Sequence, residues 1–359
     1  MKQRDFGEQK RLAIIRLCHS GLDSKTLRDE LLKQLVAVVP FSYAYFSTTD
    51  PATQLSTSSV LVEPPPAWCM GVFIENEFLQ EDFNKFNDLL SKNQAVAVLS
   101  EATGMEMTRS LRYQNILLPL GMDDELRAVF VADGVCWGQL CLHRDDANQR
   151  FTAAEAAYVA QLAPHFADGL RKALLLSDSH LARTPDEPGV LILNGRGEVV
   201  ATTAAAEYWL GELRAMEKAT NHPLPVAIHH VVVQLKAIES GLAPANATPK
   251  VRLYTRAGKW LVLYASRLRS AGGDGHISVI FEMAQPAEVA PLIMQAYELT
   301  KREGEVTQCV LRGWTTSEIA TRLHISQHTV QDHLKAIFEK VSVNSRGELA
   351  ASLFRMVNL

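Results

Sequence analysis

The chain has 359 residues, of which 47% are hydrophobic, and this length predicts more than one domain with a packed core. A formal net charge of −4 excludes a protein that binds nucleic acid through overall positive charge, so any such surface must be local. The N-terminus is charged and the sequence has no run of about 18 apolar residues, so we expect a cytoplasmic protein without a membrane partner.

The five cysteines are isolated along the chain and odd in number. None of them belongs to a C-x-x-C or a Cys/His zinc spacing, so the sequence predicts reduced thiols and no metal site. The positions are Cys18, Cys69, Cys136, Cys141 and Cys309.

The first elements are predicted from hydrophobic spacing. Apolar residues recur every three to four positions over 6–38, which predicts two helices, and a further helical pattern covers 73–90. A strand is expected at 41–48. Apolar runs at 116–120, 126–131 and 135–142 predict a sheet, with a hairpin turn at Asp133-Gly134. Thr152 and Glu155 form a capping box that begins a helix reaching residue 176.

This order of helices, sheet and closing helix resembles a GAF sensor domain over residues 1–176. The resemblance rests on GQLCLHR at 138–144, which is followed by FTAAE at 151–155. A linker is predicted at 177–188, where the sequence is polar and contains two prolines.

A second unit follows the linker. Strands at 189–193 and 198–201 flank Asn194-Gly195, a predicted hairpin turn in which both residues tolerate positive φ. A helix at 204–213 and strands at 251–254, 260–268 and 276–281 complete the pattern, which resembles a PAS domain over 189–284. We expect a connecting helix at 285–296.

The C-terminal segment contains strong helix signals. Gly313 ends one helix, because glycine reaches the left-handed conformation without strain, and Ser326 caps another that reaches Lys340. Capping boxes mark three helix starts: Thr300 with Glu303, Thr315 with Glu318, and Ser345 with Glu348.

The helix predicted at 326–340 is amphipathic. Its apolar stripe, expected to face the core, consists of Val330, Leu334, Ile337 and Val341. The opposite face carries His328, Gln331, Asp332, Lys335 and Glu339. For an isolated helix, such a face is most often a solvated surface, so the spacing of the surrounding motif must decide between this interpretation and a binding role.

That spacing is similar to the LuxR/FixJ-type DNA-binding domain. The matching residues are Leu299-Thr300-x-Arg302-Glu303-x-Glu305-Val306, Gly313, Glu318-Ile319-Ala320-x-x-Leu323-x-Ile325-Ser326-x-x-Thr329-Val330-x-x-His333-Leu334-x-x-Ile337-x-x-Lys340 and Arg346-x-Glu348-Leu349. The resemblance implies an all-α, four-helix domain over 297–359, with a supporting helix at 315–323 and a recognition helix at 326–340 in the major groove. We therefore expect a multidomain α+β protein, with GAF-like and PAS-like α/β sensor domains before this helix-turn-helix.

The resemblance also implies which residues bind DNA. His328 is expected among them, on the exposed face of the recognition helix. Gln331 is expected to bind adenine, Lys335 guanine and Asp332 cytosine. Phosphate contacts are expected from Thr329, Lys340 and Arg346. The family commonly has lysine at the position of Gln331, and Asp332 adds a negative charge, so we expect weak nonspecific affinity and a strong dependence on dimerisation.

A catalytic function has little support, because the sequence lacks P-loop, G-x-S-x-G and H-E-x-x-H signatures. Adjacent histidines on a helical pattern point in different directions, so His229 and His230 are not expected to share a metal. Single histidines of this kind are more often ordinary surface or core residues. The candidates considered are His143, His165, His222, His229 and His230.

Two other classes of regulator are disfavoured. A phosphorylated receiver needs an early acidic pair after its first strand, which is missing here, and regulators of acyl-homoserine-lactone type usually have a single sensor. We predict a non-enzymatic transcription regulator without cofactor, whose partners are double-stranded DNA, a second copy of the chain, a small-molecule effector and, as a further candidate, RNA polymerase.

In the alternative hypothesis the regulator is constitutive, and its N-terminal domains serve only dimerisation or protein contacts. Aromatic residues do not decide between the two hypotheses, because they can line a pocket but more often belong to a core. They are Trp68, Phe73, Trp137, Trp209 and Trp260.

Overall fold

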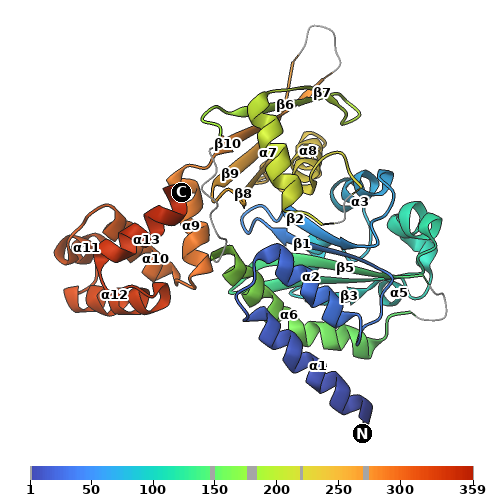
Figure 1. Ribbon diagram of the computed structural model, residues 1–359, viewed down its shortest axis with the longest axis horizontal. Helices are drawn as coiled ribbons and strands as arrows, with labels where there is room; N and C mark the ends of the chain where they lie inside the picture. Colours follow the sequence, from blue (N-terminus) through green and yellow to red (C-terminus); the bar gives the residue numbers. More distant parts are fainter. Residues whose placement is uncertain (1, 146–149, 176–183, 219–220, 270–274, 359) are drawn as a thin grey trace. The chain divides into compact units, whose positions relative to one another are not determined.

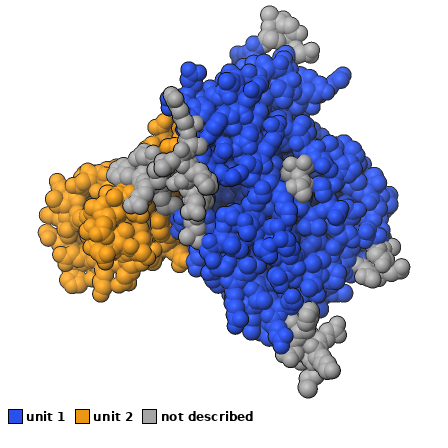
Figure 2. All heavy atoms as spheres, viewed as in Figure 1, with its two compact units in different colours: residues 1–257, 261–282 blue, residues 258–260, 283–359 orange. Residues whose placement is uncertain are grey.

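The computed structural model describes residues 2–145, 150–175, 184–218, 221–269 and 275–358. The chain divides into two compact units (Figure 2). The N-terminal unit comprises residues 1–257 and 261–282, and the C-terminal unit comprises 258–260 and 283–359. No helix among the described residues is long and apolar enough to cross a bilayer.

The first lobe of the N-terminal unit, residues 2–175, contains a five-stranded antiparallel sheet in the order β2-β1-β5-β4-β3 (Figure 1). Its strands are β1 (Tyr43–Thr49), β2 (Ser56–Val62), β3 (Val96–Val98), β4 (Asp124–Ala132) and β5 (Val135–Arg144). Its helices are α1 (Lys2–Cys18), α2 (Ser24–Leu35), α3 (Trp68–Leu79), α4 (Phe86–Ser91), α5 (Leu99–Ala102) and α6 (Ala153–Leu175).

The two faces of this sheet bury different kinds of side chain, because successive residues of a strand point to opposite sides. Phe46 and Phe130 pack against Phe166 of α6, with ring centroids 6.1 and 5.0 Å away. On the other face, Arg127 of β4 reaches Glu77 of α3 at 2.6 Å. The α6 face is therefore an aromatic and aliphatic core, whereas the α3 face contains charges.

A chain of buried ion pairs lies on the α3 face. The Glu125 carboxylate lies 2.7 Å from Nη2 of Arg112 and 3.1 Å from Nε of Arg127. Burial alone would raise the pKa of Glu125, but these two guanidinium groups hold it well below its ordinary value. His143 lies 3.1 Å from the other oxygen of Glu125. The charges are thus matched inside the lobe.

Most predicted elements of this lobe are confirmed, including the hairpin at Asp133-Gly134, both of which have positive φ, and the capped helix after Thr152. The strand predicted at 116–120 is wrong: Tyr113–Leu117 is a π-helical turn and Leu118–Leu120 a 3₁₀ turn. The helical pattern over 73–90 is interrupted between α3 and α4. Sequence reasoning missed β2, which is rich in serine, and the short β3.

The second lobe has the same strand order as the first, β7-β6-β10-β9-β8. Its strands are β6 (Gly189–Leu193), β7 (Val199–Thr202), β8 (Lys250–Tyr254), β9 (Trp260–Arg267) and β10 (Ile277–Met283), and its helices are α7 (Ala204–Ala215) and α8 (Val226–Glu239). Trp209 of α7 is buried in its core. The predicted fold class of α/β domains followed by a helical domain is confirmed, whereas the PAS-like assignment and the domain boundaries remain predictions.

The predicted turn at Asn194-Gly195 joins β6 to β7, but its positive φ lies at Gly197. Asn194 acts through its side chain, whose Oδ1 accepts hydrogen bonds from the amides of Arg196 and Glu198. The turn is longer than the two residues expected, because this asparagine caps a loop and does not itself adopt the left-handed conformation.

Several contacts join the two lobes within the N-terminal unit. Arg252 of β8 donates to both carboxylate oxygens of Asp50, at 2.7 and 3.1 Å. The connector after α7 pairs with the edge of the first sheet: the Leu61 amide donates to the Lys218 carbonyl, and the Lys218 amide donates to the Ser59 carbonyl, both at 3.1 Å. The predicted sensor domains are therefore one packed body. Residues 177–183 of the predicted linker lie outside the described residues.

Glu217 is buried in this connector. Its Oε1 accepts a hydrogen bond from the Val226 amide at 2.8 Å. Burial raises the pKa of its carboxyl to about 7, although nearby cations such as Arg28 oppose the shift. A group that ionises near neutral pH thus lies where the second lobe packs on the first.

The C-terminal unit is helical, as predicted. Its helices are α9 (Pro286–Ala296), α10 (Lys301–Leu311), α11 (Thr316–Leu323), α12 (Gln327–Val341) and α13 (Arg346–Asn358). The connecting helix predicted at 285–296 corresponds to α9, which packs on α13.

Candidate nucleic-acid interface

Helices α11 and α12 form the predicted helix-turn-helix. Thr315 and Ser326 cap them by accepting hydrogen bonds from the amides of Glu318 and Thr329. Between them, His324 adopts the left-handed conformation at φ 53°, which ends α11 and turns the chain. Gly313 follows α10 at φ 78°, as expected from its position. The local signals therefore determine where both helices begin.

The buried stripe of α12 is confirmed. Val330, Leu334, Ile337 and Val341 are all buried. Because these residues face the core, the opposite side of α12 must face solvent within the C-terminal unit. Gln331, Asp332 and Lys335 are exposed there, as predicted.

Gln331 and Lys335 are among the exposed side chains of α12 that have no hydrogen-bond partner among the described residues. They line an open groove of about 660 Å³ that extends along α12 to the turn before α13. An amide and an ammonium group that are not engaged within the protein can bind an external ligand without first breaking an internal bond. Their role in reading bases stays a prediction.

Asp332 is paired on this same face. Its Oδ2 lies 3.0 Å from Nδ1 of His328, one helical turn earlier, and both side chains are largely exposed. An exposed pair of this kind contributes little to stability. It does place the carboxylate and the imidazole together, so His328 and Asp332 would meet DNA as one unit.

Thr329 and Lys340, expected at phosphates, make internal contacts. The Thr329 hydroxyl lies 2.8 Å from that of Ser326, where it closes the cap of α12. The Lys340 ammonium donates to the Glu303 carboxylate at 2.7 Å and to the Glu298 carbonyl at 2.9 Å. The ammonium thus links α12 to α10, and its contact with phosphate stays a prediction, in which DNA would compete with the Glu303 carboxylate.

Arg346 also makes internal hydrogen bonds. Its Nη1 donates to the Trp314 carbonyl and its Nη2 to Thr316 Oγ1, both at 2.8 Å. These bonds tie the start of α13 to the start of α11. The guanidinium group therefore has a structural role that its sequence position did not indicate.

Two further arginines lie near the ring of Trp314. The guanidinium carbons of Arg312 and Arg322 are each 5.9 Å from the ring centroid. Sequence reasoning missed this cluster, although the Arg-Gly-Trp run before a capping box was a usable signal. Arg312 precedes α11 and Arg322 lies in its last turn, so the cluster places two cations along this helix.

The third predicted capping box, at Ser345 and Glu348, is confirmed for one of its two hydrogen bonds. Ser345 Oγ accepts a hydrogen bond from the Glu348 amide at 3.1 Å, as predicted. The Glu348 carboxylate, however, accepts a hydrogen bond from the amide of Asn344, not from that of Ser345. The helix start is confirmed, and the reciprocal bond is displaced by one residue.

The candidate histidines do not gather into a site. His143 bonds to Glu125, His230 accepts a hydrogen bond from the Ser56 amide, and His222 packs edge-on against His229. Within the described part of the chain, no three His, Cys, Asp or Glu side chains are placed to hold a metal ion.

Replacing Arg346 by alanine should mainly destabilise the C-terminal unit, by about 2 kcal/mol, because two hydrogen bonds are lost at about 1 kcal/mol each. Urea unfolding of the full chain would measure this change, with Lys301→Ala as the exposed control. In DNA titrations under conditions where the variant stays folded, the slope of the logarithm of the DNA-binding constant against the logarithm of the salt concentration should stay unchanged. An unchanged free energy of unfolding, together with a salt slope smaller in magnitude by about 0.9, would instead support the predicted phosphate contact of Arg346.

Comparison with known proteins places the C-terminal helices in a family. Residues 297–353 match the model described as bacterial regulatory proteins, luxR family. Spore germination protein GerE of Bacillus subtilis is 41% identical over 61 residues, which are 17% of this chain and 82% of GerE. The probable transcriptional regulatory protein SgaR of Hyphomicrobium methylovorum is 40% identical over 60 residues, 17% of this chain and only 28% of SgaR.

Solved structures resemble other parts of the chain more distantly. One is the VqsR LBD domain of Pseudomonas aeruginosa, with 16% identity and a TM-score of 0.34. The match covers 46% of this chain and 97% of the VqsR chain. A GAF domain/HD domain protein of Geobacter sulfurreducens, at 17% identity and a TM-score of 0.33, covers 44% of this chain and 98% of its own. At these TM-scores the likeness supports no statement about ligands. The identity to GerE over most of that protein's length shows that the chain belongs to the luxR family of bacterial regulatory proteins.

Proposed function

We propose that this DNA-binding transcription regulator acts in the cytoplasm by placing α12 in the major groove, under the control of a small molecule bound by its N-terminal unit. The observation that carries the DNA-reading part is the exposed face of α12, where Gln331 and Lys335 have no partner among the described residues. The buried stripe behind them fixes the helix on the domain.

The chemistry of this face predicts which bases it prefers. A glutamine amide can donate to and accept from adenine in the major groove, and a lysine can donate to the two acceptors of guanine. The pair of His328 and Asp332 limits the choice further, because its carboxylate can accept only from a base such as cytosine. The face is therefore suited to a mixed sequence.

Phosphate contacts would come from elsewhere in the domain. The amino end of α11, capped by Thr315, presents backbone amides, and the Arg312 and Arg322 cations lie beside Trp314. Such contacts fix the register of the helix on the duplex without reading sequence. Thr329 and Arg346 would add to them only if they also reach outward.

One helix-turn-helix spans only a half-site, so the regulator is proposed to act as a homodimer on a repeated operator. RNA polymerase remains a candidate partner, because an activator must contact the transcription machinery. In the alternative hypothesis, the N-terminal unit only dimerises. Loss of regulated expression when residues 1–285 are deleted, with DNA binding retained, would favour sensing over that alternative.

Replacing Gln331 by alanine should relax base preference. The wild-type chain should bind the operator more tightly than the same site with the contacted adenine replaced. In the variant, this difference in binding free energy should shrink by about 1–3 kcal/mol, because one paired base contact disappears. Mobility-shift titrations of the full chain on its own upstream DNA would measure this, and Lys335→Ala should act likewise at a guanine.

The matched control is Gln308→Ala, the same change at an exposed position of α10. It should leave both affinities unchanged. An equal loss on every sequence after Gln331→Ala would contradict base reading by this residue.

A further inference from the structure

One apolar cavity of the first lobe is too small for an organic ligand. The cavity between its sheet and α3 measures about 50 Å³, and its walls are mainly apolar, including Cys69, Met70 and Phe73. Sites for small molecules generally measure about 300–1,000 Å³. The ion pairs of Glu125, Arg112 and Arg127 occupy the neighbouring part of the same sheet face.

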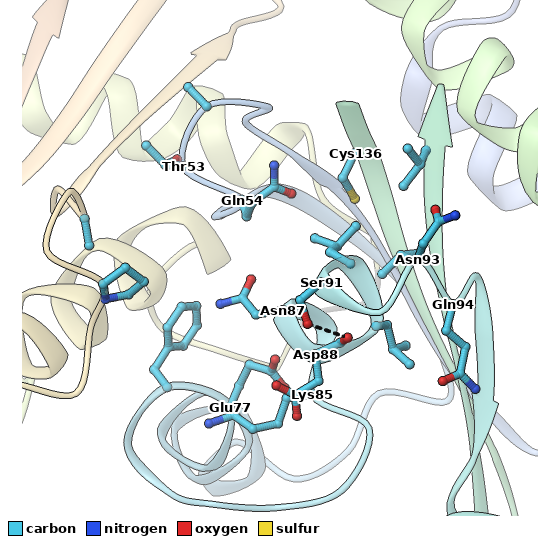
Figure 3. A pocket seen from close by; sticks show the side chains of 18 of the residues that line it. Thr53, Gln54, Glu77, Lys85, Asn87, Asp88, Ser91, Asn93, Gln94 and Cys136 are labelled. Atoms are coloured by element: carbon cyan, nitrogen blue, oxygen red, sulfur yellow. Dashed lines mark hydrogen bonds between the residues drawn. The ribbon is translucent and has the colours of Figure 1, made fainter. Parts of the chain in front are cut away.

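A much larger cleft, of about 860 Å³, lies within the N-terminal unit where the two lobes meet (Figure 3). One wall comes from the β1–β2 turn and the region around α4 in the first lobe. The other comes from the end of α8 and the loop that follows it in the second lobe. Its volume is suited to a metabolite, and ligand sites occur preferentially between domains.

The cleft wall contains polar groups without partners among the described residues. Gln234 of α8 is only 7% exposed, and its amide has no hydrogen-bond partner among the described residues. Thr53 Oγ1 and Gln54 Oε1 are buried and equally without a partner. A buried polar group left unpaired costs about 1–3 kcal/mol, so native proteins normally satisfy it with water or a ligand. The three groups come from both lobes.

The amide groups dominate the chemistry of the cleft. In Figure 3, Gln54 and Asn87 extend into the space from different elements. The Gln54 Nε2 group already donates to the Pro51 carbonyl at 2.8 Å, but each amide keeps a further donor and an acceptor, which match the hydroxyl groups of a ligand. Phe78 adds an apolar surface to the wall. The amide residues are Gln54, Asn87, Asn93, Gln94, Gln234 and Asn246.

The charged groups of the wall balance one another. Glu77 is paired with Arg127 at 2.6 Å, and the Lys85 ammonium donates to the Gln80 carbonyl at 2.6 Å. Asp88 is the remaining charged side chain among the described lining residues, and its negative charge offsets that of the Lys85 ammonium, so these groups give the wall no net charge. A neutral ligand fits this wall better than an acid.

We propose that the cleft between the lobes binds a neutral, hydroxyl-rich metabolite of the sugar or polyol class. This inference deepens the sensing part of the proposed function and does not depend on DNA binding. Because Thr53 and Gln54 belong to one lobe and Gln234 to the other, the ligand bridges both, and its binding energy favours one arrangement of the lobes.

The test is calorimetric titration of the full, DNA-free chain with D-glucose, maltose and myo-inositol. At least one of them should bind more tightly than about 1 mM. Glucose 6-phosphate and decanoate represent the anionic and the apolar classes and should bind at least tenfold more weakly. Gln234→Leu should weaken the neutral ligand at least tenfold, because it removes both polar atoms at similar volume.

Gln139→Leu is the matched control, a buried glutamine of β5 outside the cleft, and it should leave the affinity unchanged. The proposal is overturned if none of the neutral probes binds, if the anionic or apolar probe binds best, or if Gln234→Leu has no more effect than the control. If the ligand proposal is overturned but the Gln234→Leu variant still binds the operator, the failure concerns the cleft and not the DNA-binding function.

Discussion

Replacing Arg127 by methionine should lower the free energy of unfolding of the N-terminal unit by about 3–5 kcal/mol. Arg127 is fully buried and neutralises two carboxylates, with Glu77 at 2.6 Å and Glu125 at 3.1 Å. Methionine fills similar space but leaves both acids inside the lobe with one cation fewer. Urea unfolding followed by tryptophan fluorescence and circular dichroism would measure the loss.

Two further variants separate the charge effect from a packing effect. Arg16→Met changes an exposed arginine of α1 and should alter the free energy of unfolding by less than about 0.5 kcal/mol. Adding Glu77→Gln to Arg127→Met should recover part of the loss, since one uncompensated carboxylate is removed. No recovery, or a loss no larger than that of Arg16→Met, would contradict the importance of the ion pairs.

Replacing Glu217 by glutamine should stabilise the N-terminal unit at pH 8 by about 3 kcal/mol, the equivalent of a pKa raised from 4.5 to about 7. The folded protein holds this proton more tightly than the unfolded chain does. The stability it contributes is therefore complete below about pH 4 and is lost as the pH rises to about 7. Glutamine stays neutral and keeps an oxygen for the Val226 amide.

Unfolding at pH 4 and pH 8 would check the sign. The two proteins should be equally stable at pH 4, and the difference should appear between pH 4 and 7. Glu207→Gln, an exposed acid of α7, serves as the control and should show no such pH dependence. A gain of equal size at both pH values would mean that ionisation is not its cause.

The Glu217 change also bears on the proposed sensing role, because Glu217 lies in the connector that packs the second lobe on the first. Its neighbour Lys218 pairs with β2 through its backbone and with Asp29 of α2 through its ammonium. Strengthening this connector should reduce the freedom of the lobes to rearrange around the cleft. We therefore expect Glu217→Gln to change ligand affinity as well as stability.

The helix-turn-helix could be predicted from the sequence because its signals are local. The caps at Thr315 and Ser326 bond to amides three residues later, and the stripe through Val330 and Ile337 follows from helical geometry alone. The hairpin at Asp133-Gly134 is equally local, since its turn requires positive φ at both residues. Such features do not depend on distant parts of the chain.

Other features were decided by tertiary structure. The apolar run at 116–120 is suited to a buried helix or a buried strand alike, and only packing selected the helical turns. Lys340 and Arg346 are engaged by Glu303 and Trp314, 37 and 32 residues away in sequence. No periodicity encodes these distances, so their phosphate role was assigned from position alone.

The cleft depends still more on the fold. Gln54 and Gln234 carry no motif, and they line the same cleft only because the second lobe packs on the first. By itself, the sequence determined the helix-turn-helix, since hydrogen bonds and periodicity over a few residues specify it. Where charges are buried, which cations remain free and where a ligand can fit were decided by contacts between distant segments, since burial and pairing arise only on folding.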